Sequence, residues 1–191
     1  MAKVEIKMPN TITIEYHQEK GDKYYGSCLW ARFVLDLDNY DMHITSDCGS
    51  YGNCWVPTPD TESFLRLLSR MDTEYLLRKI ADRNTVDTDK TYSNVKEYLE
   101  YLANKENLDD IGIDMESLYT ACTYDDPKEI VDAIYSEISG SVVYDMADNF
   151  EIFECIYMDY SVNQKKIGEV FEGCIKPKIK EMLDDEKNTK L

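Results

Sequence analysis

The residue types best suited to metal binding or nucleophilic chemistry gather in one short segment, SDCGSYGNCWVPTP, from Ser46 to Pro59. Five residues lie between Cys48 and Cys54, whereas roughly two to four usually lie between paired zinc-binding cysteines. A disulfide between them would require an oxidising compartment, and the segment has no lysine to complete a phosphate-binding loop. We therefore interpret it as an elaborate glycine-containing turn, and we predict no bound metal and no cofactor.

Hydrolytic catalysis has little support in the residues. The chain has two histidines, His17 and His43, and it contains neither a G-x-S-x-G elbow nor an H-E-x-x-H motif. The acids of DLDNYD resemble the start of a calcium loop, but the glycine and the closing glutamate of such a loop are missing. We expect a protein that is not an enzyme, and we keep a carboxylate-metal enzyme as the weakest alternative.

Negative charge is the strongest chemical signal in the sequence. The chain carries 38 acidic and 21 basic residues, which gives a net charge of −17. DNA, RNA and anionic membranes repel such a chain, so we expect no direct binding to nucleic acid or membrane. A basic surface on another protein would attract it.

The acids concentrate in the middle of the chain and are mixed with tyrosines, which supply large, rigid contact area at binding surfaces. Residues 84–137 hold 14 acids and 4 bases. We predict a partner-binding face whose carboxylates stand in for nucleic-acid phosphates; a solvated face with some tyrosines in the core is the alternative. The predicted face consists of Glu97, Glu100, Asp109, Asp110, Asp114, Glu116, Asp125, Asp126, Glu129, Asp132, Tyr98, Tyr101 and Tyr124.

The elements that must position these residues are of two kinds. Residues 1–59 alternate between apolar and polar in VEIKM, in TITIEYH, over 29–37 and over 42–45, which predicts an antiparallel meander of four strands. Helical spacing follows at 64–71, 73–80, 91–107, 114–124, 126–138 and 161–183, where Pro177 should kink or interrupt the last helix. Residues 141–160 are ambiguous between helix and strand.

These patterns predict an α+β fold in which an N-terminal four-stranded antiparallel sheet packs on helices and a larger acidic helical region follows. We place the sheet and two covering helices in residues 1–83 and the acidic helices in 84–191, on the same core or as an extension. The open side of the sheet should carry Trp30, Arg32, His43 and Thr45, which form an alternative partner-binding surface.

Two consecutive segments resemble a family of phage and prophage proteins. In ITSDCGSYGNCW a strand ends in Ser-Asp before a glycine- and tyrosine-containing turn and a tryptophan, and SFLRLLSRMDTEYLLRKIA follows as a helical segment. The resemblance covers about residues 24–83. It implies a phage or mobile-element origin and no defined enzymatic activity.

By analogy with acidic phage proteins that block host defence, we expect a non-enzymatic, anti-CRISPR-type inhibitor. Its partner would be a host defence protein with a basic groove, with a Cas nuclease favoured, in the cytoplasm of the bacterial host. The sequence is compatible with a homodimer. The alternative from a different class is a phage regulatory or scaffold protein that binds its partner through the open sheet face.

Overall fold

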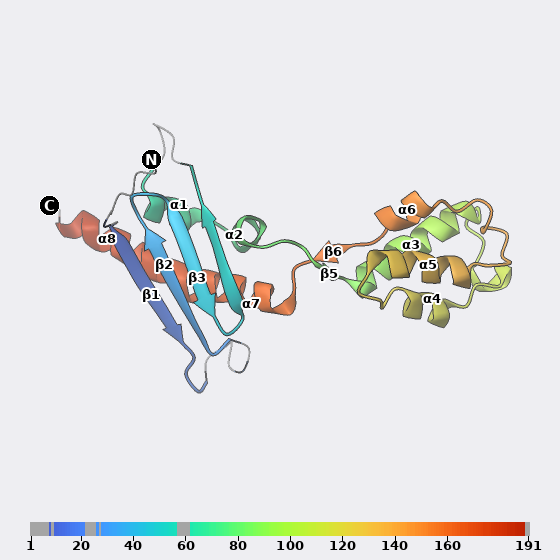
Figure 1. Ribbon diagram of the computed structural model, residues 1–191, viewed down its shortest axis with the longest axis horizontal. Helices are drawn as coiled ribbons and strands as arrows, with labels where there is room; N and C mark the ends of the chain where they lie inside the picture. Colours follow the sequence, from blue (N-terminus) through green and yellow to red (C-terminus); the bar gives the residue numbers. More distant parts are fainter. Residues whose placement is uncertain (1–7, 9, 22–25, 27, 57–61, 190–191) are drawn as a thin grey trace, which may run out of the picture. The chain divides into compact units, whose positions relative to one another are not determined.

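The structure is a computed structural model that describes residues 8, 10–21, 26, 28–56 and 62–189. The chain forms two compact units, one made of residues 1–82 and 160–191 and the other of residues 83–159 (Figure 1). The second unit is therefore inserted into the first along the chain. The α+β class with an N-terminal four-stranded antiparallel sheet is confirmed.

The sheet of the first unit has the strand order β1-β2-β3-β4. Its strands are β1 (Thr11–His17), β2 (Trp30–Asp36), β3 (Asp41–Ser46) and β4 (Gly49–Cys54). The register places Phe33 of β2 between Ile14 of β1 and Ile44 of β3. Alternate side chains of β2 and β3 are buried on one face, as the apolar pattern predicted.

The fourth strand lies where the sequence predicted only a turn. The expected strand VEIKM falls almost wholly outside the described residues, and the segment 46–59 contains β4 instead. Gly49 begins β4 with a φ of 121°, a left-handed conformation that glycine tolerates. Because β4 is a final strand of the sheet, it needs main-chain hydrogen bonds to β3 but no alternating apolar side chains, so the pattern failed to reveal it.

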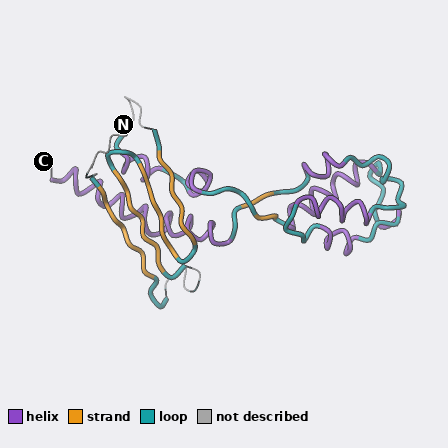
Figure 2. Tube along the Cα trace, viewed as in Figure 1, coloured by secondary structure: helices purple, strands orange, loops and turns teal. Residues whose placement is uncertain are grey.

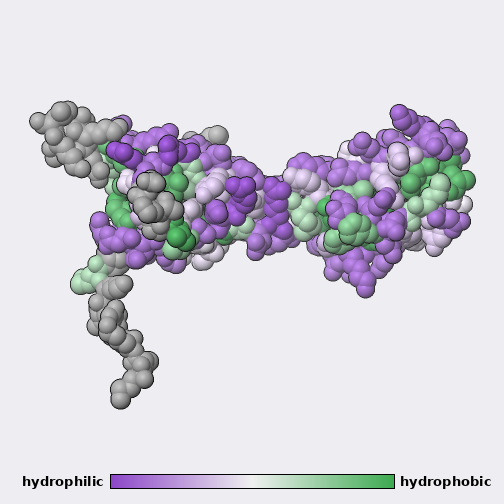
Figure 3. Space-filling view, turned by 90° about the horizontal axis from the view of Figure 1, so that it is seen from above, coloured by the Kyte–Doolittle hydropathy of each residue, from purple (hydrophilic) through white to green (hydrophobic). Residues whose placement is uncertain are grey.

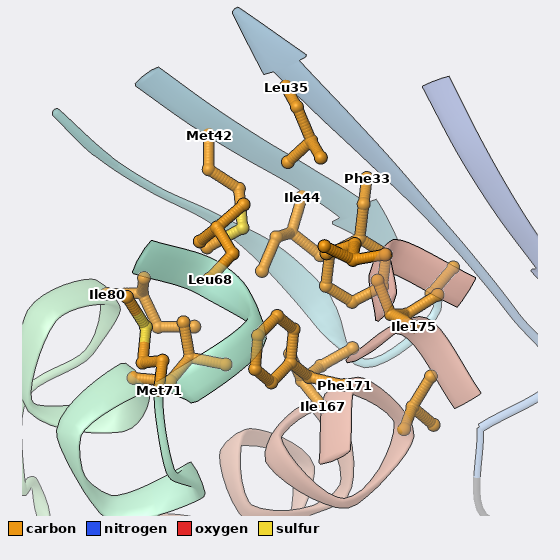
Figure 4. Close-up of a cluster of buried hydrophobic side chains, with 14 of the residues drawn as sticks. Phe33, Leu35, Met42, Ile44, Leu68, Met71, Ile80, Ile167, Phe171 and Ile175 are labelled. Carbon is orange, nitrogen blue, oxygen red and sulfur yellow. The ribbon is translucent and has the colours of Figure 1, made fainter. Parts of the chain in front are cut away.

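Helices cover one face of this sheet (Figure 1). They are α1 (Phe64–Arg70), α2 (Thr73–Ile80), α7 (Val162–Val170) and α8 (Lys176–Thr189). Phe33 and Ile44 of the sheet meet Leu68 of α1 and Phe171, which follows α7, in the buried core (Figure 4). The ring centroids of Phe33 and Phe171 are 6.3 Å apart.

The expected interruption at Pro177 takes the form of a π-helical segment. Between α7 and α8, η2 (Phe171–Ile175) widens the helix, and the Lys176 N–H donates to the Phe171 carbonyl, five residues earlier. Proline has no N–H and cannot complete an α-helical ladder, so a wider turn just before it keeps the helix continuous. None of the helices in the described residues is long and apolar enough to cross a membrane.

The second unit is helical and has its own core. It contains α3 (Thr88–Leu102), the 3₁₀ turn η1 (Asp109–Ile111), α4 (Met115–Ala121), α5 (Pro127–Glu137) and α6 (Asn149–Glu154). Two short strands, β5 (Thr85–Val86) and β6 (Met158–Asp159), pair where the chain enters and leaves the unit (Figure 2). The ambiguous stretch 141–160 therefore contains both a helix and a strand. The fully buried residues of the second unit include Leu99, Leu118, Ile134 and Ile152.

The sequence division grouped residues 160–191 with the acidic helices, whereas this part of the chain belongs to the first unit, where α7 and α8 contribute buried residues to the core beneath the sheet. The helix α7 packs against α2, which lies far away in the sequence, and Gly168 of α7 lies close to Leu77 of α2. Local periodicity identifies an apolar helix face but not the surface that it covers.

Candidate partner-binding surface

The excess negative charge belongs to the second unit. Residues 83–159 contain 19 acids and 5 bases, so this unit carries a net charge of −14, and the rest of the chain carries −3. Lys90 pairs with Asp87 at 3.4 Å and Lys96 with Glu100 at 3.7 Å. Because the bases are so few, internal ion pairs cannot neutralise the acids, and the unit remains strongly anionic.

Some of these acids have a local structural role. The side chain at the N-cap of α3, α4, α5 and α6 accepts a main-chain N–H of the first turn. These caps are Asp87, Asp114, Asp126 and Asp148. Hydrogen bonds from Ser117 lower the pKa of Asp114, because they stabilise the ionised form of this cap. Asp114 and Asp126 therefore stabilise helix ends whether or not they contact a partner. An aspartate directly before a helical pattern is the sequence signal that indicates such a cap.

Three predicted residues line a hollow of about 330 Å³ between α4 and α5. Asp114, Glu116 and Tyr124 share it with Glu137 and with the hydroxyl of Thr120. The Thr120 hydroxyl donates to the Glu116 carbonyl at 2.9 Å, so it is already bonded within the helix. Carboxylates dominate this hollow, so it would attract cations by their charge and would not select one shape of cation over another.

Three other predicted residues line a second hollow, of about 440 Å³, between α3 and the end of α6. Glu97, Tyr98 and Tyr101 come from α3, and Glu154 and Cys155 come from the end of α6. Two tyrosine rings and two carboxylates thus lie around one concave surface. This composition suits a cation with a flat face, because aromatic rings and carboxylates both attract it.

Hydrogen bonds hold the walls of this second hollow in place. The main-chain N–H of Asp148 donates to the Tyr98 hydroxyl at 3.1 Å, and the Asn94 amide donates to the Cys155 carbonyl at 3.0 Å. Burial raises the pKa of Tyr98, and the Glu151 carboxylate raises it further, so the hydroxyl stays neutral. The Tyr98 ring is therefore a fixed wall.

The raised pKa of Cys155 shows that several carboxylates lie near its thiol. Burial raises the pKa of this thiol, and Glu151, Glu154 and Glu97 raise it further through their charges. Two of these acids come from α6 and the third from α3. The tertiary structure thus gathers negative charge from two helices around one point.

The other predicted residues lie outside these hollows. Glu100 is half-buried and pairs with Lys96, and Asp109 and Asp110 are exposed in η1. The exposed acids of α5 and of the residue pair before it are Asp125, Asp126, Glu129 and Asp132. The predicted set is therefore spread over all parts of the unit from α3 to α5, with two concave groupings within it.

Sequence reasoning missed a set of exposed apolar residues in the same unit. On the face seen in Figure 3, hydrophobic side chains interrupt the hydrophilic surface. Phe150 is 69% exposed and Phe153 is 49% exposed, both on α6. Val142, Tyr144 and Met146, in the preceding turns, are exposed too. The apolar run over 141–160 was the available signal, and it fits neither helical nor strand periodicity throughout.

The alternative surface on the sheet also faces solvent. Trp30, Arg32, His43 and Thr45 are all exposed, and the register places Thr45 beside Arg32. The Arg32 guanidinium pairs with Glu15 at 2.8 Å, and the His43 ring lies 3.0 Å from the Asp41 carboxylate. The charges of this face are thus partly compensated, that of Arg32 by a residue on the adjacent strand β1 and that of His43 by a residue on its own strand β3.

The cysteine-rich segment brings Cys48 to Cys28 rather than to Cys54. Donor atoms of Cys28, Asp47 and Cys48 lie within 4.8 Å of one another, so these residues are the ones that could hold a metal ion within the described part of the chain. The Asp47 carboxylate accepts the N–H groups of Leu29 at 2.9 Å and of Trp30 at 3.3 Å. Burial raises the pKa of Cys28 to about 12. Protonated thiols and a hydrogen-bonded carboxylate here connect the start of β2 to the β3–β4 turn.

Comparison with known proteins gives one match. A family model described as a phage family, Phage_phiTE_072, matches residues 4–184. No curated protein and no solved structure matches the chain. The match covers nearly the whole sequence, including both structural units.

Proposed function

Because the chain belongs to this phage family, we propose that it is a phage-encoded inhibitor that binds a basic, nucleic-acid-binding surface of a host defence protein. The second unit would make the contact, and a Cas nuclease is the favoured partner. The supporting observation is the concentration of charge, −14 of the total −17, in residues 83–159. Exposed tyrosines among these acids supply contact area that charge alone lacks.

Electrostatics would govern how this complex forms. Exposed carboxylates such as Glu129 and Asp132 attract a cationic groove over distances of about 10 Å at moderate salt. Such contacts mainly accelerate association and exclude anionic competitors, while a smaller number of buried contacts determine the lifetime of the complex. Inhibition would then follow from occupation of the groove, with no chemical step.

Salt dependence tests the electrostatic part of this proposal. Affinity for each of a panel of purified Cas nucleases would be measured at low and high NaCl concentration, and at least one should bind about tenfold more weakly at high salt. Reversing Glu97, Glu129 and Asp132 to lysine should weaken binding, whereas reversing the exposed acids Glu19, Asp82 and Glu181 of the first unit should have little effect. Affinity that does not change with salt, or equal effects of the two triple variants, contradicts the proposal.

Stoichiometry tests the non-enzymatic part. Nuclease activity should fall in proportion to the molar ratio of inhibitor to nuclease and reach a constant level quickly. Inhibition by a small fraction of an equivalent that keeps increasing with incubation time would instead indicate catalysis.

The open sheet face supports a second candidate function, that of a phage regulatory or scaffold protein. Trp30 is 36% exposed on a sheet face that the helices leave uncovered (Figure 1). Tryptophan is enriched among the residues that dominate binding energy at interfaces. In this case Trp30→Ala should abolish partner binding and the lysine reversals in the second unit should leave it intact.

A further inference from the structure

The hollow between α3 and α6 combines two tyrosine rings with carboxylates, and we infer that it is the anchor site for an arginine side chain of a basic partner segment. An apolar residue next to that arginine would pack on Phe150 and Phe153 of α6. This inference rests on the proposed function and specifies the chemistry that the partner must present.

The carboxylates of the hollow are available to a ligand. Glu97 and Glu154 line it from opposite helices, and neither has an ion pair within the described part of the chain. Lys96, next to Glu97 in the sequence, pairs with Glu100 instead, at 3.7 Å. A cation entering the hollow would therefore meet carboxylates from α3 and α6 without displacing a resident base.

The aromatic rings favour arginine over lysine. Tyr98 is held by the hydrogen bond from the Asp148 N–H, whereas the Tyr101 side chain is 75% exposed. A planar guanidinium can stack on a tyrosine ring and still donate two parallel hydrogen bonds to a carboxylate. A compact ammonium cannot combine these contacts, because it has no flat face to stack.

Exposed aromatic residues adjoin the carboxylates on α6. Phe150 and Phe153 are one helical turn apart, and Phe150 is also one turn from Glu154, so these side chains are neighbours on the helix surface. Aromatic residues of this kind are typical anchors in protein interfaces. Charge complementarity selects the occupant: this anionic unit repels acidic segments, so an apolar side chain that reaches Phe150 would be part of a cationic segment.

The hollow between α4 and α5 provides an internal comparison. It is lined by three acids, one more than the α3–α6 hollow, but Tyr124 is its one tyrosine, and its other walls include Ser117 and Thr120. If negative charge alone attracted arginine, the α4–α5 hollow should bind it at least as well as the α3–α6 hollow. The inference requires a preference for the α3–α6 hollow.

Nuclear magnetic resonance of the full-length, ¹⁵N-labelled protein tests this preference. The probes are the N-acetyl methylamides of arginine, of lysine and of citrulline, which has the shape of arginine without its charge. Arginine should shift the amide signals of residues 94–101 and 150–155 more than those of 114–137, and both other probes should act more weakly. Tyr101→Ala should weaken arginine binding about two- to fivefold, as expected for the loss of an exposed cation–π contact. Glu154→Gln should have an effect of similar size, as expected for the loss of a solvent-exposed ion pair.

Tyr124→Ala is the matched control and should leave the shifts at 94–101 unchanged. Shifts of equal size in the two hollows, or equal effects of arginine and citrulline, would overturn the inference. The nuclease assay separates it from the proposed function. Salt-dependent nuclease binding that is insensitive to Tyr101→Ala and Glu154→Gln refutes the anchor alone, whereas arginine binding in the hollow without any nuclease binding supports the anchor and refutes the proposed target.

Discussion

One residue type performs different tasks in this protein, and tyrosine is the clearest example. The Tyr119 hydroxyl donates to Asp89 at 2.9 Å, and that of Tyr135 donates to the Ala147 carbonyl at 2.7 Å, so both connect parts of the second unit. Tyr101, in contrast, is 75% exposed. The number of tyrosines therefore overstates the contact area available to a partner, because several are used within the fold.

The cysteines differ in the same way, and we predict that Cys54 reacts first with a thiol reagent at pH 8. Cys54 is exposed, whereas burial raises the pKa of Cys28 to about 12 and that of Cys122 to about 11, so the buried thiols form little reactive thiolate. Reaction with a chromogenic disulfide, followed by peptide mapping, measures the order. Cys54→Ser should remove the fast phase and Cys122→Ser should keep it; early labelling of Cys28 would contradict the prediction.

At the scale of the element, helix ends explain part of the acidic composition. Each of the four α-helices of the second unit begins after an aspartate whose carboxylate accepts a main-chain N–H. A negative charge at this position also interacts favourably with the helix dipole. Partner binding and helix capping therefore draw on the same residue type.

Two adjacent aspartates separate these roles. Asp126 caps α5 by accepting the Lys128 N–H at 2.7 Å, whereas the Asp125 carboxylate caps no helix within the described part of the chain. Asp126→Ala should lower the free energy of unfolding by about 1 kcal/mol. Asp125→Ala should change it by less than about 0.5 kcal/mol. Urea denaturation of both variants provides the measurement, and equal losses would show that Asp126 has no special capping role.

The contact between α2 and α7 depends on a glycine. A Cβ on Gly168 would lie 2.5 Å from the Thr73 methyl carbon and 3.3 Å from Leu77, so the helices could not stay as close. We predict that Gly168→Ala destabilises the protein by about 1–3 kcal/mol through overpacking, although alanine favours helix formation.

Thr73→Ser removes the obstructing methyl group and provides the matched test of this prediction. The double variant Gly168→Ala, Thr73→Ser should recover much of the lost stability in thermal denaturation, while Thr73→Ser alone should have a small effect. A double variant as unstable as Gly168→Ala would locate the strain elsewhere.

At the scale of the whole molecule, the inserted unit has the features of an independently folding domain. It has its own buried core, and its two chain ends are joined by the β5–β6 pair, in which Thr85 lies opposite Asp159. The acidic residues and the sheet thus belong to different units of the chain, and each unit has its own core.

We predict that residues 83–159 fold when expressed alone. The fragment should show helical circular dichroism, a cooperative thermal transition and dispersed amide resonances that overlay those of the same residues in the full-length protein. A fragment with a gradual, non-cooperative transition would show that the first unit is needed to stabilise the second.

Local patterns in the sequence were sufficient for most elements. Alternation over 11–17, 29–37 and 42–45 identified three strands, and helical periodicity located α1 to α5, with the largest difference at α3, predicted at 91–107 and observed at Thr88–Leu102. The sequence also showed which segment of the chain carries the excess of acids, because the charge of a segment follows from its composition alone. These features are local, since residues two to four apart determine which side of a strand or helix is apolar.

The tertiary structure decided everything that depends on contacts between distant residues. It made β4 a strand through hydrogen bonds to β3, placed α7 and α8 in the core of the first unit, and brought the free thiols of Cys28 and Cys48 close together. It also brought Glu97 and Glu154 to one hollow. No periodicity encodes such contacts, because chain topology and the packing of complementary surfaces, rather than neighbours in sequence, determine which faces meet.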